Sequence, residues 1–292
     1  MRRRPLTVLA ALLLGATAAC GGTDRPVAGP TTVPSSAEPS AGPSATPPAP
    51  RSSPPASASP AWRVGASALP LRPDGFGQVL DTPVVLRRRT LQAPDLLPPP
   101  PGGHWAARVL PVDAGVRARM GSTWSPACPV ALADLRLLRV AFRGFDGRAH
   151  TGELVVAARV AGDVVGVFHR LWSAGFPIEE LRLPTTADVD AAPTGDGNLT
   201  AGYACRAARG QRRFSSHAYG IAVDLDPFQN PEVKRDLVLP ELASAYVDRR
   251  DVRPGMVVAG GPAVAAFRAI GWTWGGTWTS SKDWMHFSAD GR

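Results

Sequence analysis

The 292-residue sequence predicts one folded region that contains both strands and helices, preceded by a tail that does not fold. Two strand-like runs, 139–143 and 153–160, flank the turn signal Phe145-Asp146-Gly147 and predict a hairpin. Asp163 can cap a helix that continues to about Ala174, because apolar residues recur there at helical spacing. About 230 residues follow the tail (292 − 61 = 231), which is enough for one substantial core.

The tail carries the signs of export and of a linker. Arginines at positions 2–4 precede an apolar stretch that is too short to span a bilayer, so residues 1–20 are expected to be an export signal. The signal ends in Thr-Ala-Ala-Cys, which resembles a bacterial lipobox and predicts lipidation of Cys20; simple secretion with cleavage near Ala19 is the alternative. Residues 21–61 are rich in Pro, Ser, Ala and Thr, and are expected to be a disordered linker that reaches on the order of 100 Å.

The charge of the chain is +8, and nearly all of its cations are arginines, because only Lys234 and Lys282 are lysines. A basic exported protein could bind anionic wall polymers or lipid headgroups. The preference for arginine can equally reflect the composition of the genome. The sequence shows no interleaving of basic and aromatic residues of the kind that binds nucleic acid, so no nucleic-acid partner is expected.

Outside the signal the sequence has two cysteines, Cys128 and Cys205. In an oxidising compartment two such cysteines often form a disulfide, which is expected here; two separate buried thiols are the alternative. Residues 62–101 contain strand-like runs that are broken by prolines and end in four consecutive prolines. This stretch is expected to be a strand-containing appendage rather than a domain of its own.

Two short stretches carry a possible metal site. His217 and Asp224 are seven positions apart (224 − 217 = 7), and Asp283 precedes His286 by three (286 − 283 = 3). Two imidazoles and one carboxylate are a ligand set for a catalytic zinc, which keeps its fourth position for water. A further carboxylate beside that water could act as a general base.

The spacing of the first stretch has a physical reason. Gly220 permits a turn, and residues 221–225 then alternate as a strand that can bring Asp224 back towards His217. On a short final strand, His286 would face the site and Met285 the core. A single histidine in a turn is more often structural, but an unpaired aspartate within an apolar strand is costly to bury. The four residues together therefore favour a metal site.

The pattern S-x-H-x-x-G-x-A-x-D from Ser215, followed by Asn-Pro and then D-x-x-H-F, resembles the VanY-type zinc D-alanyl-D-alanine carboxypeptidases. These enzymes are grouped with lysostaphin-type enzymes and the hedgehog signalling domain. The likeness is greatest to a bacterial lipoprotein branch that has F-x-C-R, here 203–206 with Tyr in place of Phe, and G-W-x-W-G-G-x-W, here 271–278. It runs from about Met120 to Arg292.

The resemblance implies an α+β fold with a small, mainly antiparallel sheet and flanking helices, as in the hedgehog and D,D-peptidase group. It implies a zinc peptidase domain over residues 102–292 that cleaves peptidoglycan stem peptides, foremost as a D-alanyl-D-alanine carboxypeptidase. The residue roles that it implies are one zinc ion on His217, Asp224 and His286, with Asp283 as general base. Arg206 is expected to polarise the substrate near the scissile carbonyl, where a fixed cation stabilises a developing oxyanion.

Ser215 and Tyr219 are expected to contact substrate through the same motif, and Trp278 is expected to line a groove for it. An endopeptidase of the same fold and a wall-binding protein without catalysis remain alternatives, although the latter would typically lack the base. A serine hydrolase is a weaker alternative, since no G-x-S-x-G motif is present. With the lipid anchor, the protein is expected outside the cytoplasm, fixed to the cell membrane and facing the cell wall.

Overall fold

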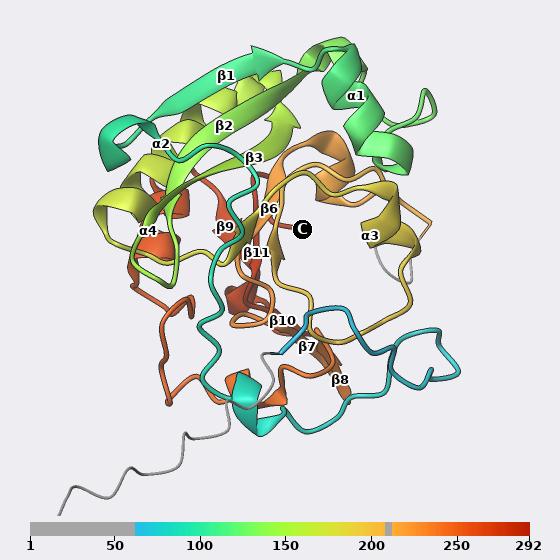
Figure 1. The fold of residues 1–292 in the computed structure, drawn as a ribbon. Coiled ribbons are helices and arrows are strands. Elements are labelled where there is room, and N and C mark those ends of the chain that lie inside the picture. Colours follow the sequence, from blue (N-terminus) through green and yellow to red (C-terminus); the bar gives the residue numbers. More distant parts are fainter. Residues whose placement is uncertain (1–61, 208–211) are drawn as a thin grey trace, which may run out of the picture. The chain divides into compact units, whose positions relative to one another are not determined.

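A computed structural model describes residues 62–207 and 212–292 (Figure 1). The predicted signal at 1–20, its Cys20 and the linker at 21–61 lie outside the described residues. The described part has helices and mainly antiparallel sheets, so the fold is α+β, as the sequence predicts. No helix within it has the length and apolar character needed to span a membrane.

The longest strands form an antiparallel sheet in the order β1 (Ala107–Pro111), β2 (Leu135–Arg143), β3 (Ala149–Ala157). The predicted hairpin is confirmed, since β2 and β3 pair along their whole length, and β2 begins four residues earlier than its periodicity indicates. The predicted helix is also confirmed as α2 (Ala161–Ser173), but Asp163 does not cap it, because the helix begins two residues earlier and Asp163 lies in its first turn. Its apolar residues form the main core with one face of the sheet, because both surfaces repeat apolar side chains at the period of their own element.

The opposite face of this sheet packs against α1 (Ala114–Met120). Asp113 caps this helix by accepting a hydrogen bond from the Val116 N–H. Cys128 and Cys205 form a disulfide, the pairing that the sequence leads us to expect, with 5.9 Å between their Cα atoms. The bond ties the segment before β2 to the residue next to Arg206.

The rest of the domain is built from strands of two or three residues (Figure 1). One sheet has the order β6 (Ala222–Asp224), β11 (His286–Ser288), β9 (Thr273–Trp274), and another has the order β10 (Lys282–Asp283), β7 (Glu232–Lys234), β8 (Leu237–Leu239). β4 (Glu180–Leu181) and β5 (Leu199–Thr200) form a parallel pair, and the remaining helices are α3 (Thr186–Asp190) and α4 (Pro262–Arg268). The strand expected at 221–225 is therefore shortened to β6.

Residues 62–101 do not form the strands expected of them. Their regular structure is limited to two 3-10 turns, η1 (Val84–Leu86) and η2 (Pro101–Gly103), and one isolated bridge between Leu71 and Gly77. The reason is that the backbone of this segment bonds to loops and side chains of the main body rather than to a neighbouring strand. Gly77 N–H, for example, donates to the Glu241 carboxylate, and Leu69 N–H donates to the carbonyl of Pro193.

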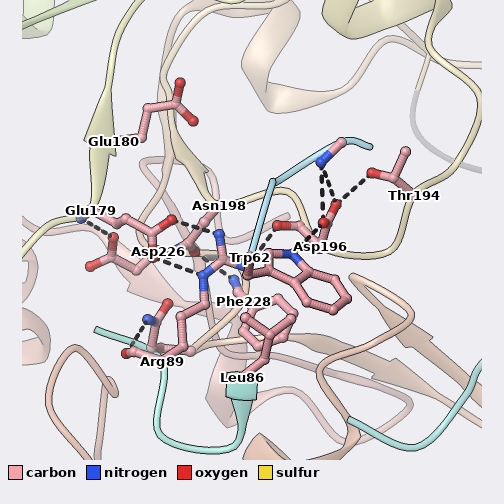
Figure 2. A network of polar contacts seen from close by, with 12 residues as sticks. Trp62, Leu86, Arg89, Glu179, Glu180, Thr194, Asp196, Asn198, Asp226 and Phe228 are labelled. Atoms are coloured by element: carbon pink, nitrogen blue, oxygen red, sulfur yellow. Dashed lines mark hydrogen bonds and ion pairs between the residues drawn. The ribbon is translucent and has the colours of Figure 1, made fainter. Parts of the chain in front are cut away.

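A buried ion pair joins this segment to the main body (Figure 2). The Arg89 guanidinium lies 2.6 Å from a carboxylate oxygen of Glu179 and donates to the main-chain carbonyl of Asp196 at 2.7 Å. It also stacks 4.4 Å from the ring centre of Phe228. The Trp62 indole N–H donates to the Asp196 carboxylate at 2.9 Å. The segment is therefore part of the same compact unit as the sheets.

Candidate metal centre

His217 lies in the 3-10 turn η6 (Ser216–Tyr219), which ends at Gly220. Gly220 has a φ of 65°, and a Cβ atom there would come within 2.5 Å of the Ala157 backbone nitrogen. Only glycine meets both conditions, because the left-handed conformation is costly for other residues and the close approach leaves no room. The turn that the sequence predicts here therefore packs against the end of β3.

Asp224 and His286 lie directly opposite each other on the paired strands β6 and β11. On its other side Asp224 forms an isolated bridge with Ala201. The turn η6 then brings His217 against this pair, so that one ligand atom from each of the three residues lies within 4.8 Å of the other two. The three predicted metal ligands are therefore brought together by the fold.

The donor atoms of these three residues face one another. His217 Nε2 lies 3.2 Å from a carboxylate oxygen of Asp224, and His286 Nδ1 lies 3.0 Å from the other oxygen. The two imidazole nitrogens are 3.2 Å apart. Both histidines are buried, and the Asp224 side chain is about one-fifth exposed, at 18%.

The second nitrogen of each imidazole is bonded to a carbonyl. His217 Nδ1 contacts the main-chain oxygen of Gly202, and His286 Nε2 lies 2.8 Å from that of Arg292. Because a main-chain oxygen only accepts, each of these nitrogens carries a proton, which leaves His217 Nε2 and His286 Nδ1 as the nitrogens that could offer lone pairs to a cation beside Asp224. Outer partners of this kind commonly orient histidine metal ligands.

The residues fit a zinc ion by the chemistry and spacing of their donors. Ligands about 2.0–2.1 Å from a tetrahedral zinc lie about 3.3 Å from one another, close to the separations seen here. Two imidazole lone pairs at 3.2 Å repel each other unless a cation lies between them. The site is thus shaped to hold one cation beside Asp224.

The electrostatics of the three side chains agree with this. Burial by itself would raise the pKa of Asp224, but His217 and His286 hold this pKa well below its usual range. Burial by itself would lower the pKa of His286, but Asp224 and then Asp283 raise it to about 9. Without a metal a proton therefore takes the place of the cation, and a metal ion must displace it.

The site opens into a cleft of about 1520 Å³. The remaining predicted site residues that line this cleft with the three ligands are Arg206, Ser215, Trp278 and Asp283. Tyr219, predicted to contact substrate, is not among the lining residues and is 37% exposed. Met285, expected in the core, is buried but lines the cleft.

Asp283 is held at the cleft by close backbone packing. It lies on β10, opposite Glu232 of β7. A Cβ atom on Gly275 would lie 2.6 Å from the Asp283 carbonyl oxygen, so the 3-10 turn η8 (Gly275–Thr277) reaches this strand only because position 275 is glycine. The negative charge of Asp283 contributes to the raised pKa of His286, so the predicted base lies within electrostatic reach of the three ligands.

Arg206 precedes all three ligands in the sequence and Trp278 lies between Asp224 and His286, yet both line the same cleft. The main-chain oxygen of Arg206 accepts a hydrogen bond from the Ser215 N–H, and Cys205 beside it is held by the disulfide. The ring centre of Trp278 lies 5.5 Å from that of His286, which supports the prediction that this tryptophan faces the site.

Several cleft residues were not predicted from the sequence. Trp62, Phe76 and Leu91 from the N-terminal segment line the cleft, as does Glu179. The main-chain oxygen of Arg292 was not predicted as a partner of His286 either. No local motif marks these residues, since their role depends on contacts between segments that are far apart in the chain.

This combination of convergent donors, a neighbouring carboxylate and an open cleft is that of a metal-dependent hydrolase. Residues 209–289 match the family model described as D-alanyl-D-alanine carboxypeptidase. This segment, which contains all three ligands and Asp283 but begins after Arg206, is similar to that family of peptidases, whose members are metallopeptidases. Neither the curated proteins nor the solved structures gave a match.

Proposed function

We propose that the protein is an exported zinc peptidase that hydrolyses peptidoglycan stem peptides as a D-alanyl-D-alanine carboxypeptidase. The observation that carries the proposal is the convergence of His217, Asp224 and His286, whose donor atoms lie within 4.8 Å of one another. The match over residues 209–289 supports the peptidase class, and the description of that family as D-alanyl-D-alanine carboxypeptidase supports the substrate.

In this proposal His217 Nε2, His286 Nδ1 and the Asp224 carboxylate would hold the zinc ion. When bound, zinc lowers the pKa of a coordinated water and polarises a carbonyl oxygen. The hydrogen bonds to Gly202 and Arg292 keep both imidazoles in the tautomer that offers these nitrogens.

The protein's own side chains would then carry the proton and the developing charge. Asp283 accepts the proton that the attacking water loses as its oxygen bonds to the peptide carbon. As the C–N bond breaks, Asp283 returns that proton to the leaving amine. Arg206 stabilises the negative charge that develops on the former carbonyl oxygen. Ser215 and Trp278 line the same cleft and would contact the peptide.

The location is part of the proposal. Lipidation at Cys20 would anchor the protein to the membrane, and residues 21–61 would let the catalytic domain reach into the cell wall. Labelling with a radioactive fatty acid in a bacterial host checks this: the wild-type chain should incorporate label and the Cys20→Ala chain should not. Equal incorporation in both chains would contradict an anchor at Cys20.

The function is tested by measuring bound zinc and the cleavage of a stem pentapeptide ending in D-Ala-D-Ala, with the full chain. The variant is Asp283→Ala, and the matched control is Asp248→Ala, which removes a half-exposed carboxylate outside the cleft. We expect one zinc per chain and release of one D-Ala in the wild type and the control. Asp283→Ala should keep zinc and lose activity by at least about 100-fold, because general-base catalysis contributes about 10²–10⁴-fold.

Other outcomes redirect or end the proposal. Cleavage within the peptide would retain the mechanism but make the protein an endopeptidase. Zinc binding without cleavage of either the pentapeptide or intact wall would indicate a wall-binding protein. A chain that binds no zinc would refute the proposed function as a whole.

A further inference from the structure

Residues 290–292, here called the C-terminal tail to distinguish them from the N-terminal tail described above, contact the metal centre from outside the matched family segment. His286 Nε2 donates to the main-chain oxygen of Arg292 at 2.8 Å. His286 is buried, so water has little access to replace this acceptor. The acceptor of the other histidine, Gly202, also lies outside the matched segment, but it is buried and packs against the Val155 carbonyl of β3, whereas Arg292 belongs to the C-terminal tail.

The C-terminal tail is itself held in place by a side chain next to a metal ligand. The hydroxyl of Ser216, which is buried, lies 2.8 Å from a carboxylate oxygen of Asp290 and 3.0 Å from the Arg292 main-chain oxygen. Asp290 also accepts from the Arg292 backbone N–H at 3.3 Å and pairs with its guanidinium at 2.8 Å. One small network therefore joins His286 to the residue that precedes His217.

We propose that Arg292 is a positioning residue for the metal centre and acts through its main-chain oxygen. By accepting from His286 Nε2, this oxygen fixes the tautomer and the ring orientation that aim Nδ1 at Asp224. Ser216 and Asp290 act by keeping that oxygen in place. The inference rests on the proposed function only in taking the ligand of the three residues to be a metal ion.

Loss of an outer partner of a histidine ligand typically lowers metal affinity by about 10–100-fold. Arg292 can contribute through its main-chain oxygen and through its side chain. The side chain is more than half exposed, so its ion pair with Asp290 contributes little to stability. The two contributions can therefore be separated by changing the main-chain oxygen and the side chain independently.

The experiment measures the zinc dissociation constant by competition with a chelator, using the full chain and three variants. A chain that ends after Ala289 lacks the oxygen, Ser216→Ala removes the hydroxyl that holds it, and Arg292→Ala keeps the oxygen but removes the guanidinium. We expect affinity to fall about 10–100-fold without the C-terminal tail. Ser216→Ala should weaken it in the same direction by a smaller factor, and Arg292→Ala should stay within about twofold of wild type.

Two further readouts separate positioning from folding. Thermal unfolding of the metal-free chains shows whether each variant is folded, and the visible absorption spectrum of bound Co²⁺ reports the ligand geometry. A changed Co²⁺ spectrum in the truncated chain, with metal-free unfolding unchanged, would support the role of Arg292. If the truncated chain does not fold, Ser216→Ala decides the question.

Three results would overturn the inference. The first is a folded truncated chain that binds zinc with wild-type affinity. The second applies if the truncated chain is unfolded, and is wild-type zinc affinity in Ser216→Ala. The third is a loss of zinc affinity in Arg292→Ala as large as in the truncated chain. None of them depends on peptide cleavage. A protein that binds zinc but cleaves no peptide would therefore refute the proposed function and leave this comparison intact.

Discussion

The two halves of the domain are held together by different forces. The sheet β1–β2–β3 and α2 pack through aliphatic and aromatic side chains, which with those of α4 make up most of the main core; β6, β9 and β11 add Val223, Trp274 and Phe287 to it. The half around β6, β9 and β11 has strands of two or three residues. Fully or almost fully buried polar side chains gather beside these short strands: Glu179, Asn198, Asp226, Gln229 and Asn230.

The difference shows how a site can be rigid without regular structure. Non-directional apolar burial stabilises the first half, and many side chains of similar volume would serve there. In the second half each buried polar group needs a particular partner, since an unpaired one is costly. The side-chain N–H groups of Asn230, for instance, donate to the main-chain oxygens of Leu225 and Gly255, and its side-chain oxygen accepts from the Arg249 guanidinium. Such contacts fix the backbone that carries Asp224.

The strongest test of this contrast is Arg89→Ala, which leaves the buried carboxylate of Glu179 without its cation. Breaking a buried ion pair by removing one partner costs about 3–5 kcal/mol, so the free energy of unfolding should fall by that amount. Urea denaturation of the full chain measures it. The control Arg250→Ala removes an exposed arginine with side-chain exposure of 91%, and should change the stability by about 0.5 kcal/mol or less. Similar values for both variants would show that the polar half does not depend on its buried charges.

A cavity in the apolar half should have a different signature. Leu171→Ala, in the buried face of α2, should lower the free energy of unfolding by about 2–5 kcal/mol. Because α2 does not contribute a ligand, the zinc dissociation constant of the folded variant should stay at the wild-type value. Leu96→Ala, at a site where the side chain is 60% exposed, is the matched control and should be nearly neutral. Weakened zinc binding in Leu171→Ala would mean that the two halves are coupled.

The sequence predicts the apolar half well because its signals are local. The turn at 145–147 lies between two strand-like runs, and the helix after Asp163 repeats apolar residues at its own period, so neither depends on distant segments. The ligands were predicted for another reason: donor residue types at two short spacings restrict the chemistry severely. Their approach to one another in the structure follows from the register between β6 and β11.

The remaining parts could not be predicted because distant contacts decide them. Segment 62–101 has strand-like composition, but its hydrogen bonds go to residues more than one hundred positions away, such as Asp196 and Glu241. Tyr219 matches a family motif, yet the tight turn at Gly220 leaves it outside the cleft lining. The oxygen of Arg292 is a main-chain atom, so no residue type in the sequence could mark it.

The smallest predicted effect concerns α3, a short helix that follows its N-cap residue Thr185 and contains Asp188. Burial by itself would raise the pKa of Asp188, but bonds from Arg182 and Thr185 lower it from the ordinary 3.8 to about 2. The ionised carboxylate therefore stabilises the folded state above about pH 4, and this contribution is lost as the pH falls towards 2.

The corresponding experiment compares wild type with Asp188→Asn at pH 5 and at pH 2. Because the Asp188 side chain is 29% exposed, solvent screening limits the stabilisation to about 1 kcal/mol or less. We expect urea denaturation to show the wild type more stable at pH 5 and the difference to shrink at pH 2, where other carboxyl groups affect both chains alike. A difference that is equal at both pH values would show that the capping bonds to Thr185, which the amide can partly retain, matter more than the charge. In that case α3 would resemble the polar half around the metal centre, where partner geometry rather than net charge fixes the backbone.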